Sequence, residues 1–144
     1  LHQKSGIHRN KIIEIHGNAI EARCLECGAK QNITDFHDAI KTKKQLPRCI
    51  VCNGTVKVAT ISFGQPMHEE DMEKAINIVE DSDLMIVMGS SLKVLPAGKL
   101  PNLAMQSGSK LVILNREKTR YDSIADVVIN DELQNICSGL IHEL

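Results

Sequence analysis

The hydrophobic positions in the second half of the chain follow two alternating periods. Between residues 68 and 83 they have the i, i+3, i+4, i+7 spacing of one helix face, at Met72, Ala75, Ile76 and Val79. The next segment, LMIVM at 84–88, is apolar at every position. Such a short apolar run is typical of a strand that is buried on both faces of a sheet. The pattern therefore predicts an amphipathic helix followed by an interior strand.

The same alternation continues toward the end of the chain. Pro96 can open a helix, and Gly108 can close it. Two further apolar strands are expected in LVILN at 111–115 and VVIN at 127–130, followed by an amphipathic helix from residue 132 onward. Strands that alternate with helices form parallel sheets. We therefore expect an α/β fold containing part of a Rossmann-like parallel sheet with helices on both faces.

The first half has a different pattern, dominated by cysteines. Four of the five cysteines read C-x2-C-x21-C-x2-C, at Cys24, Cys27, Cys49 and Cys52. Two short-spaced pairs allow four thiolates to converge on one structural zinc ion, with no position left for a substrate. Two disulfides are the alternative, but the odd cysteine count and the lack of a secretory signal argue against them. We expect a small zinc-ribbon module over residues 21–58, a short helix within ITDFHDAIK and a strand in ATISFG at 59–64.

Composition and charge narrow the classes of function. The 144 residues carry a net charge of −1, which gives no general electrostatic reason to expect a nucleic-acid or membrane partner. The basic segment KTKKQLPR at 41–48 is interpreted as a solvated loop, and no apolar run reaches the roughly 18 residues of a membrane span. The chain begins without Met, and three parallel strands make a thin sheet. We therefore expect it to be part of a longer protein whose N-terminal strands are missing here.

Polar residues follow each of the three predicted parallel strands. Gly89-Ser90-Ser91 comes after the first strand, Asn115 ends the second, and Asn130-Asp131 ends the third. Ligands of open parallel sheets bind beyond the carboxyl ends of the strands, where hydroxyls and amides suit phosphate and ribose oxygens. Each feature alone is also compatible with an ordinary turn. His16, in IIEIHGN, is either a partly buried histidine hydrogen-bonded to backbone or a proton-transfer group.

The order of these motifs is more specific than any one of them. LHQKSG, IIEIHGN, the two cysteine pairs, ISFGQPM, GSSLKVLPA and LVILN succeed one another along the chain. This succession resembles the sirtuins, the NAD-dependent protein-lysine deacylases, and it covers essentially the whole chain. The resemblance implies a transferase that moves an acyl group from lysine to ADP-ribose and releases nicotinamide. It implies NAD as co-substrate, a structural zinc, and an acylated-lysine protein or peptide as partner. Residues 1–20 and 59–144 would form the NAD-binding portion, and residues 21–58 the zinc-binding module.

The resemblance also assigns roles to particular residues. His16 would be the general base acting on the nicotinamide ribose, in a cleft between the zinc module and the nucleotide fold. Phe63 and Gly64 would line the acyl-lysine tunnel, and Val94 would belong to a segment that pairs with the substrate peptide. The zinc ligands would be Cys24, Cys27, Cys49 and Cys52. The NAD-binding residues would be Gly89, Ser90, Ser91, Asn115, Arg116, Glu117 and Leu133.

The chain also departs from the sirtuin pattern. The family's Gly-Ala-Gly-x-Ser loop and Gln-Asn-x-Asp motif would precede Leu1, so this polypeptide is expected to be inactive alone. Gln65 stands where Glu is frequent, and Val58 replaces a common Pro. Two alternatives remain: a protein mono-ADP-ribosyltransferase, and a non-catalytic zinc-ribbon module that binds protein. Reduced thiolates indicate an intracellular location, cytoplasmic or nuclear.

Overall fold

The computed structural model describes residues 2–143, which form two compact units, one ending at His68 and the other beginning at Glu69. Each unit has its own sheet and its own buried residues. The predicted assignment of residues 1–20 and 59–144 to NAD binding, and of 21–58 to a zinc module, stays a prediction.

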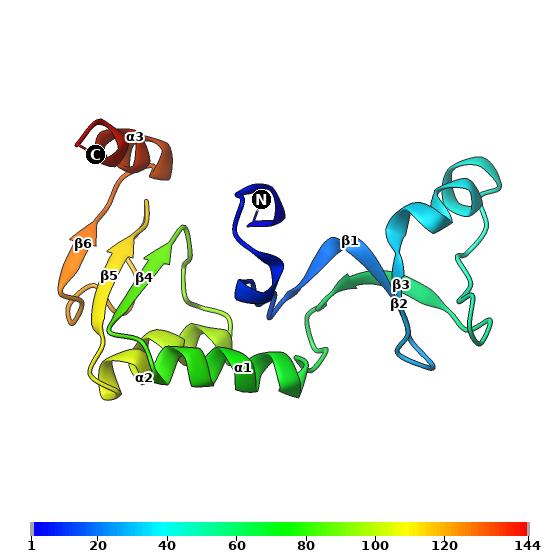
Figure 1. The fold of residues 1–144 in the computed structure, drawn as a ribbon, viewed down its shortest axis with the longest axis horizontal. Coiled ribbons are helices and arrows are strands. Elements are labelled where there is room, and N and C mark those ends of the chain that lie inside the picture. Colours follow the sequence, from blue (N-terminus) through cyan, green and yellow to red (C-terminus); the bar gives the residue numbers. More distant parts are fainter. Residues whose placement is uncertain (1, 144) are drawn as a thin grey trace. The chain divides into compact units, whose positions relative to one another are not determined.

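The first unit contains a three-stranded antiparallel sheet in the order β2-β1-β3 (Figure 1). Its strands are β1 (Gly17–Cys24), β2 (Lys30–Asn32) and β3 (Val56–Thr60). Two short 3-10 helices, η1 (His2–Lys4) and η2 (Arg9–Lys11), precede the sheet. The core of this unit is small and includes two of the metal-site cysteines; its members are Ala22, Cys24, Phe36, Cys49 and Val56.

Two sequence predictions for this unit differ in detail from the structure. The strand predicted at 59–64 instead spans Val56–Thr60, so Phe63 and Gly64 lie in the turn after it. Gly64 has a φ of +79°, outside the extended region, so it could not belong to a strand. The short helix predicted in ITDFHDAIK is divided into a 3-10 helix, η3 (Ile33–Phe36), and a π-helical turn, η4 (Asp38–Thr42).

The second unit confirms the predicted parallel sheet. Its strand order is β4-β5-β6, and both pairings are parallel. The strands are β4 (Leu84–Met88), β5 (Lys110–Leu114) and β6 (Val127–Ile129). The helices are α1 (Glu69–Glu80), the 3-10 helix η5 (Ala97–Lys99), α2 (Leu100–Gln106) and α3 (Leu133–Glu143). In Figure 1 α1 and α2 lie together beside the sheet, and α2 contacts both β4 and β5.

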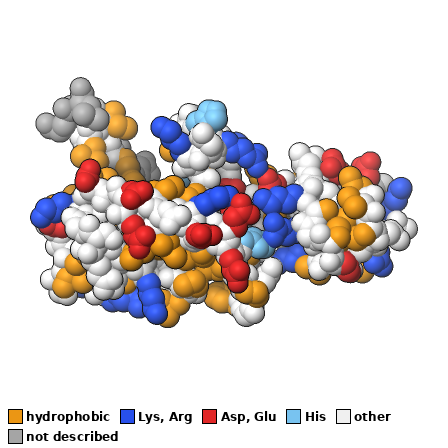
Figure 2. Space-filling view, turned by 60° about the horizontal axis from the view of Figure 1, so that its bottom comes forward, with side chains coloured by type: hydrophobic (Ala, Val, Ile, Leu, Met, Phe, Trp, Pro, Cys, Tyr) orange, Lys and Arg blue, Asp and Glu red, His pale blue; other side chains and the backbone are white. Residues whose placement is uncertain are grey.

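The two faces of this sheet differ in burial. Val87, Leu111 and Ile113 are buried on one face and pack with Leu92 and Tyr121. On the other face of β4, alternate side chains are about half exposed, at Leu84 (51%), Ile86 (50%) and Met88 (49%). The prediction that 84–88 is buried on both faces is therefore wrong for the part of the chain described. Figure 2 shows that hydrophobic side chains lie at the molecular surface among the charged ones.

Among residues 2–143, no helix is both long enough and apolar enough to cross a membrane.

Candidate metal centre and nucleotide pocket

The four paired cysteines of the first unit converge on one point. Their Sγ atoms all lie within 4.8 Å of one another, at Cys24, Cys27, Cys49 and Cys52. The Cys24–Cys52 sulfurs are 3.5 Å apart, and the Cys27–Cys49 sulfurs 3.7 Å. Four sulfurs held about 2.3 Å from one zinc ion at tetrahedral angles lie about 3.8 Å apart, whereas disulfide sulfurs are separated by about 2.05 Å. The geometry therefore fits tetrahedral zinc and excludes two disulfides.

Tight turns at the cysteine pairs bring these sulfurs together. The amide of Gly28 donates to the carbonyl of Cys24 (3.1 Å), and the amide of Asn53 donates to that of Cys49 (2.9 Å). The two turns are placed on adjacent segments because β1 pairs with β3, with Cys24 opposite Val56. Local turn chemistry and one strand pairing thus suffice to build the site.

A buried glutamine supports the thiolate of Cys49 from outside the cluster. Gln31, 9% exposed, directs its side-chain Nε2 toward the Cys49 sulfur at 3.4 Å. Its Oε1 accepts a hydrogen bond from the amide of Ile50 at 3.0 Å. The amide of Val51 also approaches the Cys49 sulfur, at 3.4 Å. Hydrogen bonds from the backbone amides of Cys52 and Val51, with those from the thiols of Cys27 and Cys24, favour the thiolate and lower the pKa of Cys49 to about 6.

A second candidate site lies at the carboxyl ends of the parallel strands. A pocket of about 340 Å³ lies there, and most of the predicted NAD-binding residues line it. The lining comprises Gly89, Ser91, Asn115, Arg116, Glu117, Glu132, Leu133 and Gln134. Segments following β4, β5 and β6 therefore meet at one edge of the sheet, as expected for an open parallel sheet.

The backbone at Gly89 and the side chain of Asn115 shape this pocket. Gly89 has a φ of +62°, and a Cβ atom there would lie 2.9 Å from Cδ1 of Leu133. Asn115, only 8% exposed, donates its side-chain Nδ2 to the carbonyl of Glu117 at 2.6 Å. Ser90 does not line the pocket; its hydroxyl accepts from the amide of Leu92 at 3.3 Å. Of the seven predicted NAD-binding residues, Ser90 is the one that does not line this pocket.

Charges of both signs border the pocket. Arg116 lies 3.2 Å from a carboxylate oxygen of Glu132 and 3.7 Å from one of Glu117. The hydrogen bond to Glu132, followed by its charge and that of Glu117, raises the pKa of Arg116. The guanidinium is exposed, so these ion pairs leave it accessible to a polar ligand.

His16 lies in the turn immediately before β1, with an exposed side chain. Its backbone carbonyl accepts a hydrogen bond from the amide of Ile61 at 2.9 Å. The next residue, Gly17, has a φ of +70°, and a Cβ there would lie 1.8 Å from the carbonyl oxygen of Ala59. Only glycine fits at this position, so the backbone of His16 is fixed against the segment that leads to Phe63.

The predicted substrate-binding residues lie on exposed loops. Phe63 is 99% exposed, and Gly64 follows it in the same turn. Val94, in the loop between β4 and η5, is 48% exposed. An exposed aromatic ring beside a glycine has room for a ligand, but the roles of Phe63, Gly64 and Val94 stay predictions.

Four residues that the sequence did not single out as part of a site support these segments. Arg120 donates to the carbonyl of Leu92, and the Tyr121 hydroxyl donates to that of Gly98 at 2.8 Å, so both hold the loop that contains Val94. Lys57 binds the turn that contains Phe63, and Gln31 binds Cys49. Of these four residues, only Tyr121 could have been noticed from the sequence, because it is the single tyrosine of a chain with few aromatic residues.

The fold and the two sites define an α/β protein with a Rossmann-like parallel sheet and a tetrathiolate metal module. The model of the Sir2 family matches residues 1–96, and the chain belongs to this family. It is 42% identical over 133 residues to an NAD-dependent protein deacetylase of Rhodopseudomonas palustris, covering 92% of this chain and 53% of that protein. It is 45% identical over 133 residues to NAD-dependent protein deacetylase 1 of Bradyrhizobium diazoefficiens, covering 92% and 52%.

Solved structures agree with this assignment. The structure of Sir2Tm bound to a propionylated peptide superposes with a TM-score of 0.89 at 34% identity, covering 99% of this chain and 59% of that chain. A Sir2 complex with p53 peptide and NAD⁺ gives a TM-score of 0.86 at 34% identity, with coverage of 99% and 58%. The chain thus spans little more than half the length of the relatives that it matches.

Proposed function

We propose that the protein containing this chain is an NAD-dependent protein-lysine deacetylase or deacylase, which transfers the acyl group to ADP-ribose and releases nicotinamide. The observation that carries this proposal is the pocket at the carboxyl ends of β4, β5 and β6, lined by residues from three separated segments. Asn115, Arg116 and Glu117 offer the amide, guanidinium and carboxylate groups that suit the hydroxyls of an adenosine ribose. The relatives named as NAD-dependent protein deacetylases support the same activity.

His16 is the proposed general base. An imidazole exchanges protons near neutral pH, so it can accept the proton of a ribose hydroxyl that attacks the acyl group. Its exposed side chain is free to meet a ligand, while its carbonyl is hydrogen-bonded to Ile61. Backbone fixation of this kind limits the positions that the ring can reach, which favours a defined proton-transfer geometry.

The metal centre has a structural role in this proposal. Four thiolates complete the coordination of a zinc ion, so no ligand position remains for water or substrate. The ion braces the sheet of the first unit through Cys24 at the end of β1. Reduced thiolates fit an intracellular enzyme, and the partner is a protein or peptide with an acylated lysine.

The experiment compares the full-length protein with its His16→Ala variant on an acetyl-lysine peptide and NAD. We expect the variant to lose deacetylation while peptide and NAD still bind, because only proton transfer is removed. Mass spectrometry follows the deacetylated peptide and acetyl-ADP-ribose. His8→Ala is the matched control, since His8 is exposed and its imidazole pairs with the neighbouring side chain of Asn10.

Two results would contradict this function. Substantial deacetylation by His16→Ala would remove His16 from the role of base. ADP-ribosylated protein as the main product, in place of acetyl-ADP-ribose, would establish the mono-ADP-ribosyltransferase alternative.

A further inference from the structure

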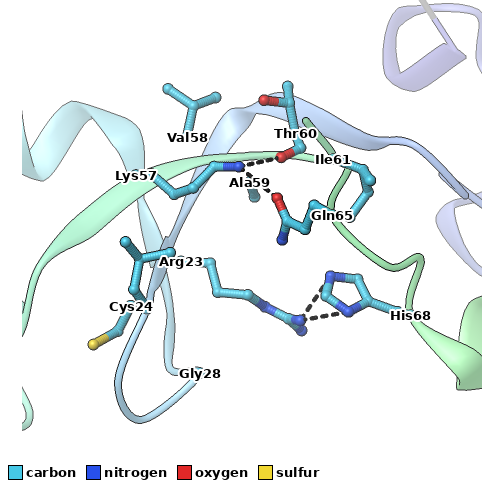
Figure 3. Close-up of a pocket in the computed structure, with 11 residues that line it drawn as sticks. Arg23, Cys24, Gly28, Lys57, Val58, Ala59, Thr60, Ile61, Gln65 and His68 are labelled. Atoms are coloured by element: carbon cyan, nitrogen blue, oxygen red, sulfur yellow. Dashed lines mark hydrogen bonds between the residues drawn. The ribbon is translucent and has the colours of Figure 1, made fainter. Parts of the chain in front are cut away.

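Lys57, on β3, directs its ammonium group into the turn that follows its own strand. Its Nζ atom donates to the carbonyl of Thr60 at 2.8 Å, to the hydroxyl of Ser62 at 3.0 Å and to Oε1 of Gln65 at 2.8 Å. An ammonium group has three N–H donors, so these oxygens account for all of them. Figure 3 shows the lysine and Gln65 side chains pointing toward each other along the wall of a pocket of about 220 Å³.

The turn itself closes around the same atoms. The amide of Ser62 donates to Oε1 of Gln65 at 3.3 Å, and the amide of Gln65 donates to the carbonyl of Ser62 at 2.9 Å. Oε1 of Gln65 therefore receives both Lys57 and Ser62. The ammonium and this amide oxygen together hold the two ends of the four-residue segment 62–65.

Nothing else described in this part of the chain holds the residues between those ends. Phe63 is 99% exposed, so packing does not fix its ring, and a Cβ atom at Gly64 would meet nothing within 4 Å. Residues without packing partners depend on the hydrogen bonds at their flanks for a defined position. The position of Phe63 and Gly64 thus depends on the hydrogen bonds that Lys57, Ser62 and Gln65 make at the flanks of the turn.

We propose that Lys57 is a positioning residue for acyl-lysine binding, acting through the turn at 62–65. This inference rests on the proposed function, in which Phe63 and Gly64 contact the acyl-lysine. A surface lysine ordinarily keeps its ammonium group in water. Lys57 instead is partly buried, and its partners are all neutral oxygens of a single turn. Its charge therefore strengthens each of these hydrogen bonds without being neutralised by a carboxylate among them.

The first test measures the turn directly, on the chain described here. In Lys57→Met, hydrogen exchange at the amides of Ser62 and Gln65 should become about tenfold faster, because hydrogen bonds to a charged donor are lost. Exchange within β1 should stay unchanged. Lys57→Arg keeps the charge and several donors and should remain close to the parent. Lys41→Met is the control, since Lys41 is exposed on η4.

The second test uses the full-length protein. Lys57→Met should raise the KM for an acetyl-lysine peptide about tenfold and leave the KM for NAD within about twofold. Gln65→Ala should have a similar effect, and the double variant should be no worse than either single one, because both act through the same contact. Gln65→Glu should retain activity, since a carboxylate also accepts from the ammonium.

The outcomes separate this inference from the proposed function. Unchanged exchange at Ser62 and Gln65 in Lys57→Met would overturn the inference, whatever the activity. So would an unchanged peptide KM, or equal losses for peptide and NAD together with lost zinc, which would mark a purely structural lysine. An unmutated full-length protein without deacylase activity would instead refute the proposed function, and faster exchange in Lys57→Met would still place the turn under the control of Lys57.

Discussion

Removal of the metal should unfold the first unit selectively. The perturbation is chelation of zinc from the chain, or replacement of one ligand in Cys49→Ser. Of the five buried residues in the core of this unit, Cys24 and Cys49 are themselves metal ligands. The apolar core that would remain comprises Ala22, Phe36 and Val56. Such a core is too small to maintain the sheet alone.

The magnitude follows from the coordination chemistry. Binding of structural zinc to small tetrathiolate or mixed sites contributes about 10–16 kcal/mol, and this binding energy is folding energy. The net stability of an ordinary domain is about 5–15 kcal/mol. Loss of the ion therefore removes an amount of free energy comparable to the entire net free energy of unfolding of such a domain. The metal also links Cys27 to Cys49 at the two ends of the segment 28–48. When the ion leaves, this segment regains the conformational entropy that closing it had cost.

Hydrogen exchange with mass spectrometry measures this outcome by region. With chelator, the amides of residues 21–58 should lose protection, while those of Leu111 and Ile113 in β5 should keep it. Cys137→Ser is the matched control for Cys49→Ser, because Cys137 lies outside the four-cysteine cluster. Retained protection of residues 21–58, in a sample proven free of zinc, would refute the structural role of the metal.

Three further predictions concern the second unit. Leu111→Ala, at a position with 0% exposure, should lower the free energy of unfolding by about 2–5 kcal/mol in denaturant titrations, and a loss below 1 kcal/mol would contradict its place in the core. Hydrogen bonds from Lys110 and from the Leu111 amide hold the pKa of Asp126 below its usual range. The Asp126 carboxylate therefore contributes fully to the free energy of unfolding above the unfolded pKa of about 3.9, and this contribution is lost as pH falls through the lower folded pKa. Asp126→Asn should therefore destabilise at pH 7 and converge with the parent in strong acid; a constant difference across melting curves would contradict this. The half-exposed apolar face of β4 should make the isolated chain self-associate in sedimentation experiments, and Ile86→Lys should reduce association, whereas a monomeric parent would refute the prediction.

The parts of the structure that sequence reasoning predicted are those with a local cause. The cysteine spacing predicts the tetrathiolate cluster because each pair needs only one tight turn. Continuous apolar runs predict the parallel strands, and the polar residues after them predict the pocket because parallel strands end at a common edge. None of these inferences requires knowledge of distant contacts.

The parts that were missed depend on contacts between separate segments. Gln31 reaches Cys49 from 18 residues away, and a glutamine in a polar strand has no pattern that predicts such a contact. Lys57 is similar, since a lysine between two valines reads as a solvated residue on a strand. The strand β3 was predicted too far along the chain because ATISFG is rich in residues that favour strands. Phe63 and Gly64 instead lie in a turn that Lys57 and Gln65 hold.

The close approach of Gly17 to Ala59 has a consequence for how the proposed deacylase can diversify. The carbonyl of His16 is hydrogen-bonded to the amide of Ile61, two residues before Phe63. The same backbone hydrogen bond therefore fixes the positions along the chain from which the imidazole and the aromatic ring project. Side chains on the following turn can be exchanged without disturbing that backbone hydrogen bond. An inserted or deleted residue between Thr60 and Phe63 would shift one group past the other. If the proposed function holds, new acyl preferences should therefore arise by substitution at this point of the chain, with its length held constant.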